Sequence, residues 1–356
     1  MTGKERIQAA MELKPVDRLP FWPKIDGSYI KKWGNTLPYY HAYFGSDRIE
    51  GIGGACREER TTCWHDIKIN GSEFVTAFGT PHGVLYQKNY FDAASQALHP
   101  VEYPIKTKRD VELMMLWYQD AAVRFDEEQR EWSAEQYEDE GEDAYIIENV
   151  GESPLMYFLE WLAGIEQGQY LLADYPGEVE GLFAAMHKNL LDKFRIAAEK
   201  SCADSLFLTE NTSTTVISPA QYEKYCYKHI GEYAKIVNER GKPMTLHMCG
   251  HLKALLPLLS RLPVTAFEAF TPPTVGNTSL LDGRSACPDK CLIGGTNAVN
   301  WLQPADAIIE YIDRTLDSLP HHRGLLLSSS GVMPPACEPE TIKTVGMWLR
   351  ERALKL

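Results

Sequence analysis

From Ala144 to the end of the chain, short apolar runs alternate with longer segments of mixed polar and apolar residues. Each short run predicts a strand, and the longer segments carry the apolar spacing of amphipathic helices. Strands are predicted at 144–148, 205–210, 244–249, 264–270, 291–295 and 324–328. Helices are predicted at 154–163, 176–200, 219–240, 253–259, 304–318 and 339–354, with a short one near Ser279. Strands that alternate with helices indicate right-handed βαβ units and a parallel sheet.

The chain before residue 144 is less regular. Thr2 and Glu5 form a capping-box signature that opens a helix through about Leu13, and 18–22 is predicted as the first strand. Glycine pairs, aromatic residues and short alternating runs predict loops and short strands across 33–104. A helical excursion is predicted at about 108–143, and its acidic second half is typical of a solvated helix.

Together these elements predict one α/β domain over residues 1–356. The units after Ala144, with a strand or two before it, favour a TIM-type (β/α)8 barrel over an open sheet. The barrel would carry an N-terminal helix and entry segment at 1–20, and the helical excursion before residue 144. Neither GxGxxG after an early strand nor GxxxxGK[ST] is present, which removes the usual signatures of nucleotide binding.

Composition narrows the class of protein. The chain is 44% hydrophobic and 24% charged, as in soluble globular enzymes, and no apolar run reaches the roughly 20 residues of a membrane helix. The formal charge of -13 argues against nucleic-acid and anionic-membrane partners. Eight cysteines without a disulfide-scaffold spacing, and no apolar signal core at the N-terminus, lead us to expect a cytoplasmic protein with mostly buried thiols.

The strongest chemical signal is the segment His247-Met248-Cys249-Gly250-His251. In a strand, side chains alternate between faces, so Thr245, His247 and Cys249 would point one way and Leu246 and Met248 the other. An imidazole and a thiol two residues apart can both reach one zinc ion. Packing and hydrogen bonding of a buried pair is the alternative interpretation.

Other polar residues also follow predicted strands. A single glutamate at a strand end is more often a solvent contact or a helix cap than a catalytic group. The repetition is more informative, because the carboxyl ends of all barrel strands meet at one mouth. The strand-end candidates are Glu148, Asn149, Glu210, Asn211, Glu268 and Asn297.

Several motifs together resemble the uroporphyrinogen decarboxylase superfamily, and specifically its corrinoid-linked methyltransferase branch. They are Glu5-Arg6-Ile7, Val16–Trp22, Ile217-Ser218-Pro219, His247-x-Cys249-Gly250-His251 and Gly331–Pro334. The resemblance spans nearly the whole chain and implies a TIM-type barrel. Haem-pathway decarboxylases carry an arginine-rich segment after the first strand to hold substrate carboxylates. Here 23–29 contains no arginine, which argues against porphyrinogen decarboxylation.

In the methyltransferase branch a His-x-Cys pair and a cysteine near the C-terminus bind zinc. The resemblance therefore implies His247, Cys249 and Cys337 as the metal ligands. Cys337 stands several residues later than the family's usual placement, and Ser330 lies nearer to it, so the loop would have to fold back. Glu210, Glu268, water or substrate could occupy a fourth position, and His251 is an alternative ligand.

The resemblance implies a zinc-dependent methyltransferase. It would move a methyl group between a small methylated ether, alcohol or amine, or a thiol acceptor, and a corrinoid carried by a partner protein. Glu148, Glu210 and Glu268 are candidates to position substrate or transfer a proton. The candidates for substrate contacts are Asn149, Asn211, Asn297, Tyr29 and Trp22, although core packing also explains the aromatic residues.

Two alternatives stay open: a decarboxylase acting on another carboxylated substrate, and a non-catalytic corrinoid-binding protein. Arginines at the mouth without zinc would favour the first. A site that binds no metal, with Cys249 exposed to solvent, would favour the second. A homodimer is implied by the superfamily alone.

Overall fold

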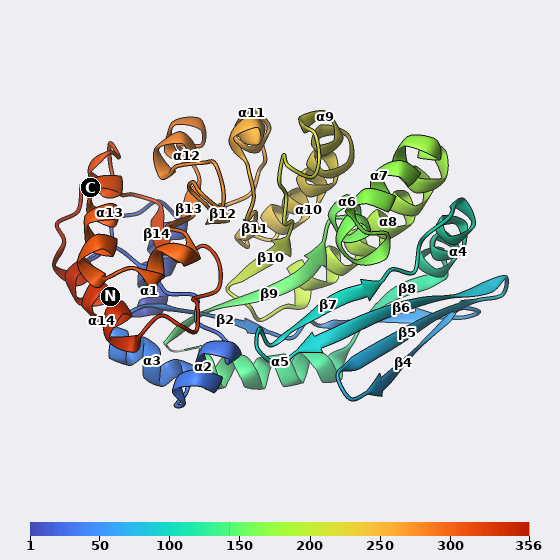
Figure 1. Cartoon of the computed structure of the whole chain (residues 1–356), viewed down its shortest axis with the longest axis horizontal. Helices are drawn as coiled ribbons and strands as arrows, with labels where there is room; N and C mark the ends of the chain where they lie inside the picture. Colours follow the sequence, from blue (N-terminus) through green and yellow to red (C-terminus); the bar gives the residue numbers. More distant parts are fainter. Residues whose placement is uncertain (142, 356) are drawn as a thin grey trace.

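Eight parallel strands form the central sheet of the computed structural model, which describes residues 1–141 and 143–355. Neighbouring strands follow the order β1-β14-β13-β12-β11-β10-β9-β2, with β1 and β2 at the two ends of the sheet. The sheet curls into a nearly closed barrel (Figure 1). The bounds are β1 (Phe21–Trp22), β2 (Arg48–Ile52), β9 (Ala144–Glu152), β10 (Ser205–Thr209), β11 (Met244–His247), β12 (Ala266–Phe270), β13 (Cys291–Gly295) and β14 (Leu325–Ser328). The predicted TIM-type barrel is confirmed.

Helices cover the outside of the barrel (Figure 1). They are α6 (Pro154–Tyr157), η1 (Phe158–Leu162), α7 (Ile165–Asp174), α8 (Pro176–Lys200), α9 (Pro219–Tyr222), η2 (Glu223–Tyr227), α10 (Lys228–Glu239), η3 (Lys253–Leu255), α11 (Leu256–Leu259), α12 (Leu280–Ala286), η4 (Ala298–Leu302), α13 (Ala305–Asp317) and α14 (Pro339–Glu351). The helix α10 shows why they pack there, because Ile230, Tyr233, Ala234 and Val237 recur at helical spacing and are all buried. The helices predicted after residue 144 are confirmed, and α7 is an addition to them.

Alternation along the strands creates two apolar layers. One layer lies between the strands and the outer helices and includes Leu246 and Met248. The other fills the barrel, where Trp22 and Ile293 meet Ile7 of α1 (Gly3–Met11). The predicted capping box of Thr2 and Glu5 begins α1, and this helix packs against β9 and β14. A barrel interior that is filled with side chains leaves the strand ends as the place for a site.

The segment between β1 and β9 is more ordered than its sequence predicts. It contains α2 (Gly27–Trp33), α3 (Leu37–Phe44), β3 (Cys56–Arg60), β4 (Trp64–Asn70), β5 (Glu73–Thr80), β6 (Gly83–Asp92), β7 (Ala97–Glu102), α4 (Lys108–Gln119), β8 (Ala121–Phe125) and α5 (Glu127–Glu140). The strands β4 to β7 form an antiparallel sheet that extends beside the barrel (Figure 1).

The predicted helical excursion at 108–143 is wrong in one respect: β8 separates two helices and pairs antiparallel with β3. The acidic helix α5 is attached to the barrel, since Ser133 donates a hydrogen bond of 2.9 Å to the carbonyl of Gly53 and the helix packs against β2 and β9. Within the described residues, no helix is both long and apolar enough to span a bilayer.

Candidate functional site

The site is centred on His247, the last residue of β11. Its imidazole lies on the barrel-facing side together with Thr245, which lines the interior, so the predicted alternation along this strand is confirmed. In the register of the sheet His247 stands beside Glu268 of β12. The Nδ1 atom of His247 is hydrogen-bonded to Oε2 of Glu268. The other carboxylate oxygen of Glu268 accepts a hydrogen bond of 3.0 Å from Nζ of Lys24.

The electrostatics of this triad follow from burial and ion pairing. Glu268 is almost fully buried, which alone would raise its pKa, but Lys24 and His247 lower the pKa to about 2. Burial alone would lower the pKa of His247, and the Glu268 carboxylate instead raises it to about 9. Glu268 therefore stays ionised and holds the ring in a fixed orientation.

Cys249 lies just beyond the strand and next to the imidazole of His247. Its thiol donates to Oδ1 of Asn211 at 3.4 Å, and Nδ2 of Asn211 donates to Oε2 of Glu160 at 2.9 Å. Gly250 makes this approach possible, because a Cβ there would lie 2.4 Å from the carbonyl oxygen of Thr212. The chain thus brings the predicted residues His247, Cys249, Glu268 and Asn211 together.

A pair of carboxyl groups, Glu152 and Glu160, completes this side of the mouth and was missed in the sequence. Burial and the neighbouring Glu160 carboxyl raise the pKa of Glu152 to about 9, and burial also raises the pKa of Glu160. Two buried carboxyl groups in contact disfavour a second negative charge, so Glu152 keeps its proton at neutral pH. The sequence signal that could have indicated Glu152 is Gly151, because a glycine inside a strand often marks a bulge. The β9–β10 pairing is irregular at this point and places Glu152 beside Thr209.

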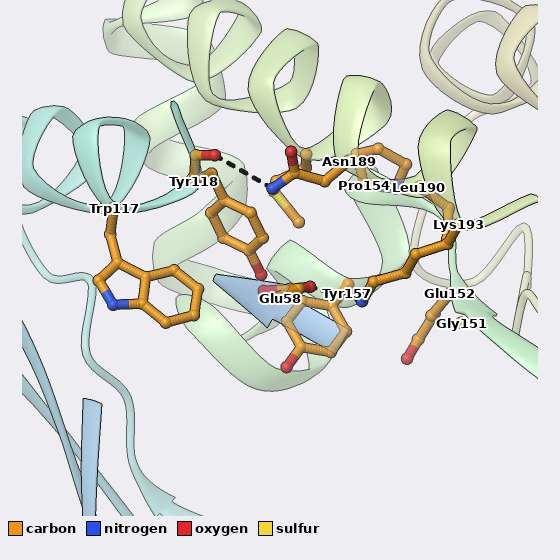
Figure 2. A pocket seen from close by; sticks show the side chains of 11 residues that line it. Glu58, Trp117, Tyr118, Gly151, Glu152, Pro154, Tyr157, Asn189, Leu190 and Lys193 are labelled. Carbon is orange, nitrogen blue, oxygen red and sulfur yellow. Dashed lines mark hydrogen bonds and ion pairs between the residues drawn. The ribbon is translucent and has the colours of Figure 1, made fainter. Parts of the chain in front are cut away.

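Glu152 also lies on the wall of an open cavity of about 190 Å³ (Figure 2). Tyr118 and Tyr157 extend into it beside Glu58, which is paired with Lys193 at 2.6 Å. The amide of Asn189 donates to the backbone carbonyl of Tyr118 (Figure 2). A chain of hydrogen bonds runs from Glu152 through Glu160 and Asn211 to the Cys249 thiol, and so links the cavity wall to the mouth.

The donor chemistry of His247 and Cys249 fits zinc. Because Glu268 accepts the hydrogen bond from Nδ1, the Nε2 atom remains the nitrogen that can bind a metal, and such a carboxylate partner is usual for metal-bound histidine. Within the described chain, however, no three His, Cys, Asp or Glu side chains converge well enough to hold a metal ion.

The predicted three-ligand set with Cys337 is therefore not formed in this structure. The loop that carries Cys337 is tied elsewhere, since Met333 N donates to Lys24 O and Trp33 Nε1 donates to Pro335 O at 2.9 Å. Tyr29 donates to the carbonyl of Cys337, and the buried thiol faces the carbonyl of Glu338. Zinc binding itself stays a prediction.

Two of the three predicted catalytic glutamates do not face the mouth. Glu210 is fully buried beside Thr212 and Cys226, on the side of β10 that faces the helices, and burial raises its pKa to about 7. Glu148 pairs in register with Leu206 of β10, whose side chain faces the helices, and the Glu148 carboxyl group lies beside Gly54. The reason is alternation: each residue neighbours an inward-facing one along its strand.

The remaining candidates divide in the same way. Asn149 lies at the mouth and donates to Thr209 at 3.1 Å. Asn297 is buried, caps the helical turn η4 and donates to the carbonyl of Pro273. Tyr29 is fully buried in the outer core and Trp22 lies in the barrel interior, so both pack as apolar residues, although Trp22 lies under the Lys24 ammonium.

An eight-stranded parallel barrel with a polar cluster at the carboxyl ends of its strands defines a TIM-type barrel enzyme. The model of the uroporphyrinogen decarboxylase (URO-D) family matches residues 144–351, more than half of the chain, and the chain belongs to this family. This confirms the predicted resemblance to the uroporphyrinogen decarboxylase superfamily, and the methyltransferase branch stays a prediction. The curated proteins contain no match to the chain.

Solved structures agree on the fold. A methyltransferase from Methanosarcina mazei is similar over 99% of this chain and 98% of its own, with 14% sequence identity and a TM-score of 0.62. At this identity the likeness shows the shared fold alone. A Listeria monocytogenes protein, described as a candidate vitamin-B12 independent methionine synthase, covers 58% of this chain and 63% of its own at 15% identity. Its TM-score of 0.33 carries no conclusion.

Proposed function

We propose that this enzyme transfers a methyl group between a small methylated compound, or a thiol acceptor, and a corrinoid carried by a partner protein. In this proposal zinc is held by His247 and Cys249. The observation that carries it is the imidazole and thiol placed together at the barrel mouth, with the buried Glu268 carboxylate behind the imidazole. The predicted methyltransferase branch supports the corrinoid partner and the methyl substrate.

Zinc, when bound, lowers the pKa of a coordinated thiol or water and polarises a coordinated oxygen. The residues of the chain have separate tasks. Glu268 orients the imidazole of His247, and Lys24 balances the carboxylate charge. Asn211 accepts the hydrogen bond of Cys249 and thereby holds its sulfur toward the mouth.

The Glu152–Glu160 pair supplies a proton at the same mouth. Below pH about 9 the Glu152 carboxyl stays protonated, because burial and Glu160 disfavour its charged form. It would give this proton to a substrate oxygen that loses its methyl group, and it would recover the proton from the cavity that it lines. A thiol acceptor has to lose its proton, so with such a substrate the carboxyl pair would accept a proton instead of giving one.

The mouth gives less support to decarboxylation. Carboxylated substrates need cationic partners, and the mouth residues described above include one lysine, Lys24, which is already paired with Glu268. Arg6 and Arg18 are bound to Asp47 before β2, at the amino end of the barrel strands. This arrangement favours a substrate without carboxylate groups.

Zinc titration of the chelator-treated protein tests the proposal. Wild-type protein should bind one zinc ion, Cys249→Ser should lose at least about 100-fold in affinity, and Cys56→Ser is the control at a half-buried thiol. Equal zinc affinity in wild type and Cys249→Ser would refute the site. Cys337→Ser should keep its affinity, and a loss there would show that the loop closes on the metal. Methylcobalamin consumption with a simple thiol provides the activity readout.

A further inference from the structure

The strand β4 is an exposed edge of the antiparallel sheet. Within the described residues it pairs with β5 alone, and all seven of its residues are exposed. Its register with β5 runs without interruption from Trp64 to Asn70, whereas the opposite edge, β7, contains Pro100 and a register shift. Exposed edge strands offer free backbone N–H and C=O groups, and proteins usually protect them with proline, bulges or charges. The strand β4 has neither proline nor bulge.

The side chains of β4 sort into two distinct faces. His65, Ile67 and Ile69 lie on one face, and Ile67 and Ile69 are 53% and 63% exposed. Trp64, Asp66, Lys68 and Asn70 lie on the other. Neither Asp66 nor Lys68 forms an ion pair within the part of the chain that the structure describes. The strand therefore carries exposed apolar surface and two unused opposite charges, two residues apart.

We propose that β4 pairs antiparallel with β4 of a second copy of this chain, centred on Ile67. In this register Asp66 lies opposite Lys68 of the partner subunit, and Lys68 lies opposite the partner's Asp66. On the other face Ile67 meets the partner's Ile67, and His65 meets the partner's Ile69. The two four-stranded sheets thus join into one eight-stranded sheet across a twofold axis.

Charge complementarity selects this partner. Asp66 and Lys68 lie on either side of Ile67 and carry opposite charges. In a symmetric dimer centred on Ile67 each therefore faces the opposite charge, and both ion pairs form at once. Directly opposed unlike charges stabilise a sheet, and like charges destabilise it. The dimer does not depend on the proposed methyl transfer.

Charge reversal tests the pairing. Asp66→Lys and Lys68→Asp each put like charges in both symmetric positions, so each should raise the dimer dissociation constant about tenfold or more. The double variant Asp66→Lys/Lys68→Asp restores both pairs and should dimerise as the wild type does. Glu102→Lys, on the opposite edge of the sheet, is the matched control and should change nothing.

Mixing the two single variants gives the sharpest result. Each should dimerise weakly alone, yet a mixture should form heterodimers with about wild-type affinity, because the two β4 lysines of the Asp66→Lys chain then oppose the two β4 aspartates of the Lys68→Asp chain. Analytical ultracentrifugation measures the association, and concentration-dependent protection of the β4 amides in hydrogen exchange locates it. A wild-type monomer at all concentrations, or a dimer that ignores the charge reversals, would overturn the proposal.

Discussion

Two buried glutamates on the strands that flank β11, Glu210 after β10 and Glu268 in β12, should respond in opposite ways to replacement by glutamine. Glu210 is buried and forms no ion pair among the residues that the structure describes, and burial raises its pKa to about 7. Glu268 is equally buried, but Lys24 and His247 lower its pKa to about 2. Sequence reasoning assigned both to catalysis, so this comparison separates a structural carboxyl group from a site residue.

The magnitude follows from linkage between pKa and folding. A raised folded-state pKa stabilises the fold below the ordinary value of 4.5, and this contribution is lost as the pH rises through about 7. A shift of this size corresponds to about 3 kcal/mol. Between pH 4.5 and pH 8, Glu210→Gln should therefore gain about 3 kcal/mol in free energy of unfolding relative to wild type.

Glu268→Gln has the opposite sign. The lowered pKa means that ionised Glu268 stabilises the fold above pH 4.5, and this contribution is lost as the pH falls through about 2. At pH 7 the variant should unfold about 3 kcal/mol more easily, because Lys24 and His247 lose their buried partner.

Urea unfolding followed by tryptophan fluorescence at a series of pH values measures both effects on metal-free protein. If the difference between wild type and Glu210→Gln stays constant from pH 4.5 to pH 8, the assigned role of burial is refuted. Zinc titration adds the functional contrast, since Glu210→Gln should bind as wild type and Glu268→Gln about 10- to 100-fold more weakly.

Two further substitutions test the scaffold. Gly250→Ala should lower the free energy of unfolding by about 1–3 kcal/mol and weaken zinc binding, because its Cβ would collide with Ser213 and displace Cys249. Gly231→Ala on α10, where a Cβ meets nothing within 4 Å, is its control and should stabilise the protein slightly. Asp47→Ala should cost about 3 kcal/mol in urea unfolding without changing zinc stoichiometry, since buried Asp47 binds Arg6 and Arg18 far from the mouth. Unchanged stability in Asp47→Ala would contradict this assignment.

Much of the fold could be predicted because its signals are local. The barrel strands after residue 144 are short apolar runs, and their helices carry a 3.6-residue apolar period, as in α8 and α10. Only short strands were predicted here, and not the antiparallel sheet, because β4 is exposed on both faces and its alternation of Ile67 and Ile69 with polar residues marks no buried face. Its pairing comes from β5 and from turns, rather than from burial.

The site residues that could be predicted are likewise those with a local sequence signal. His247 and Cys249 could be recognised because both belong to one strand end, where two-residue spacing fixes a common face. The inward position of Glu268, and the outward positions of Glu148 and Glu210, depend on register between strands. Register is set by packing across the whole barrel, and a shift of one residue reverses the face of every side chain.

The residues that the sequence did not reveal also decide what the mouth can bind. Lys24 and Glu268 cancel each other in charge. Glu152 keeps its proton at neutral pH and so adds no charge there, because burial and Glu160 raise its pKa to about 9. The cationic groups of the mouth described above, Lys24 and His247, both contact Glu268, so neither is left to hold a substrate carboxylate, and the mouth favours a substrate without one. A decarboxylase would need cationic groups that are free to hold a substrate carboxylate, which is why the methyl-transfer proposal fits this set of side chains better.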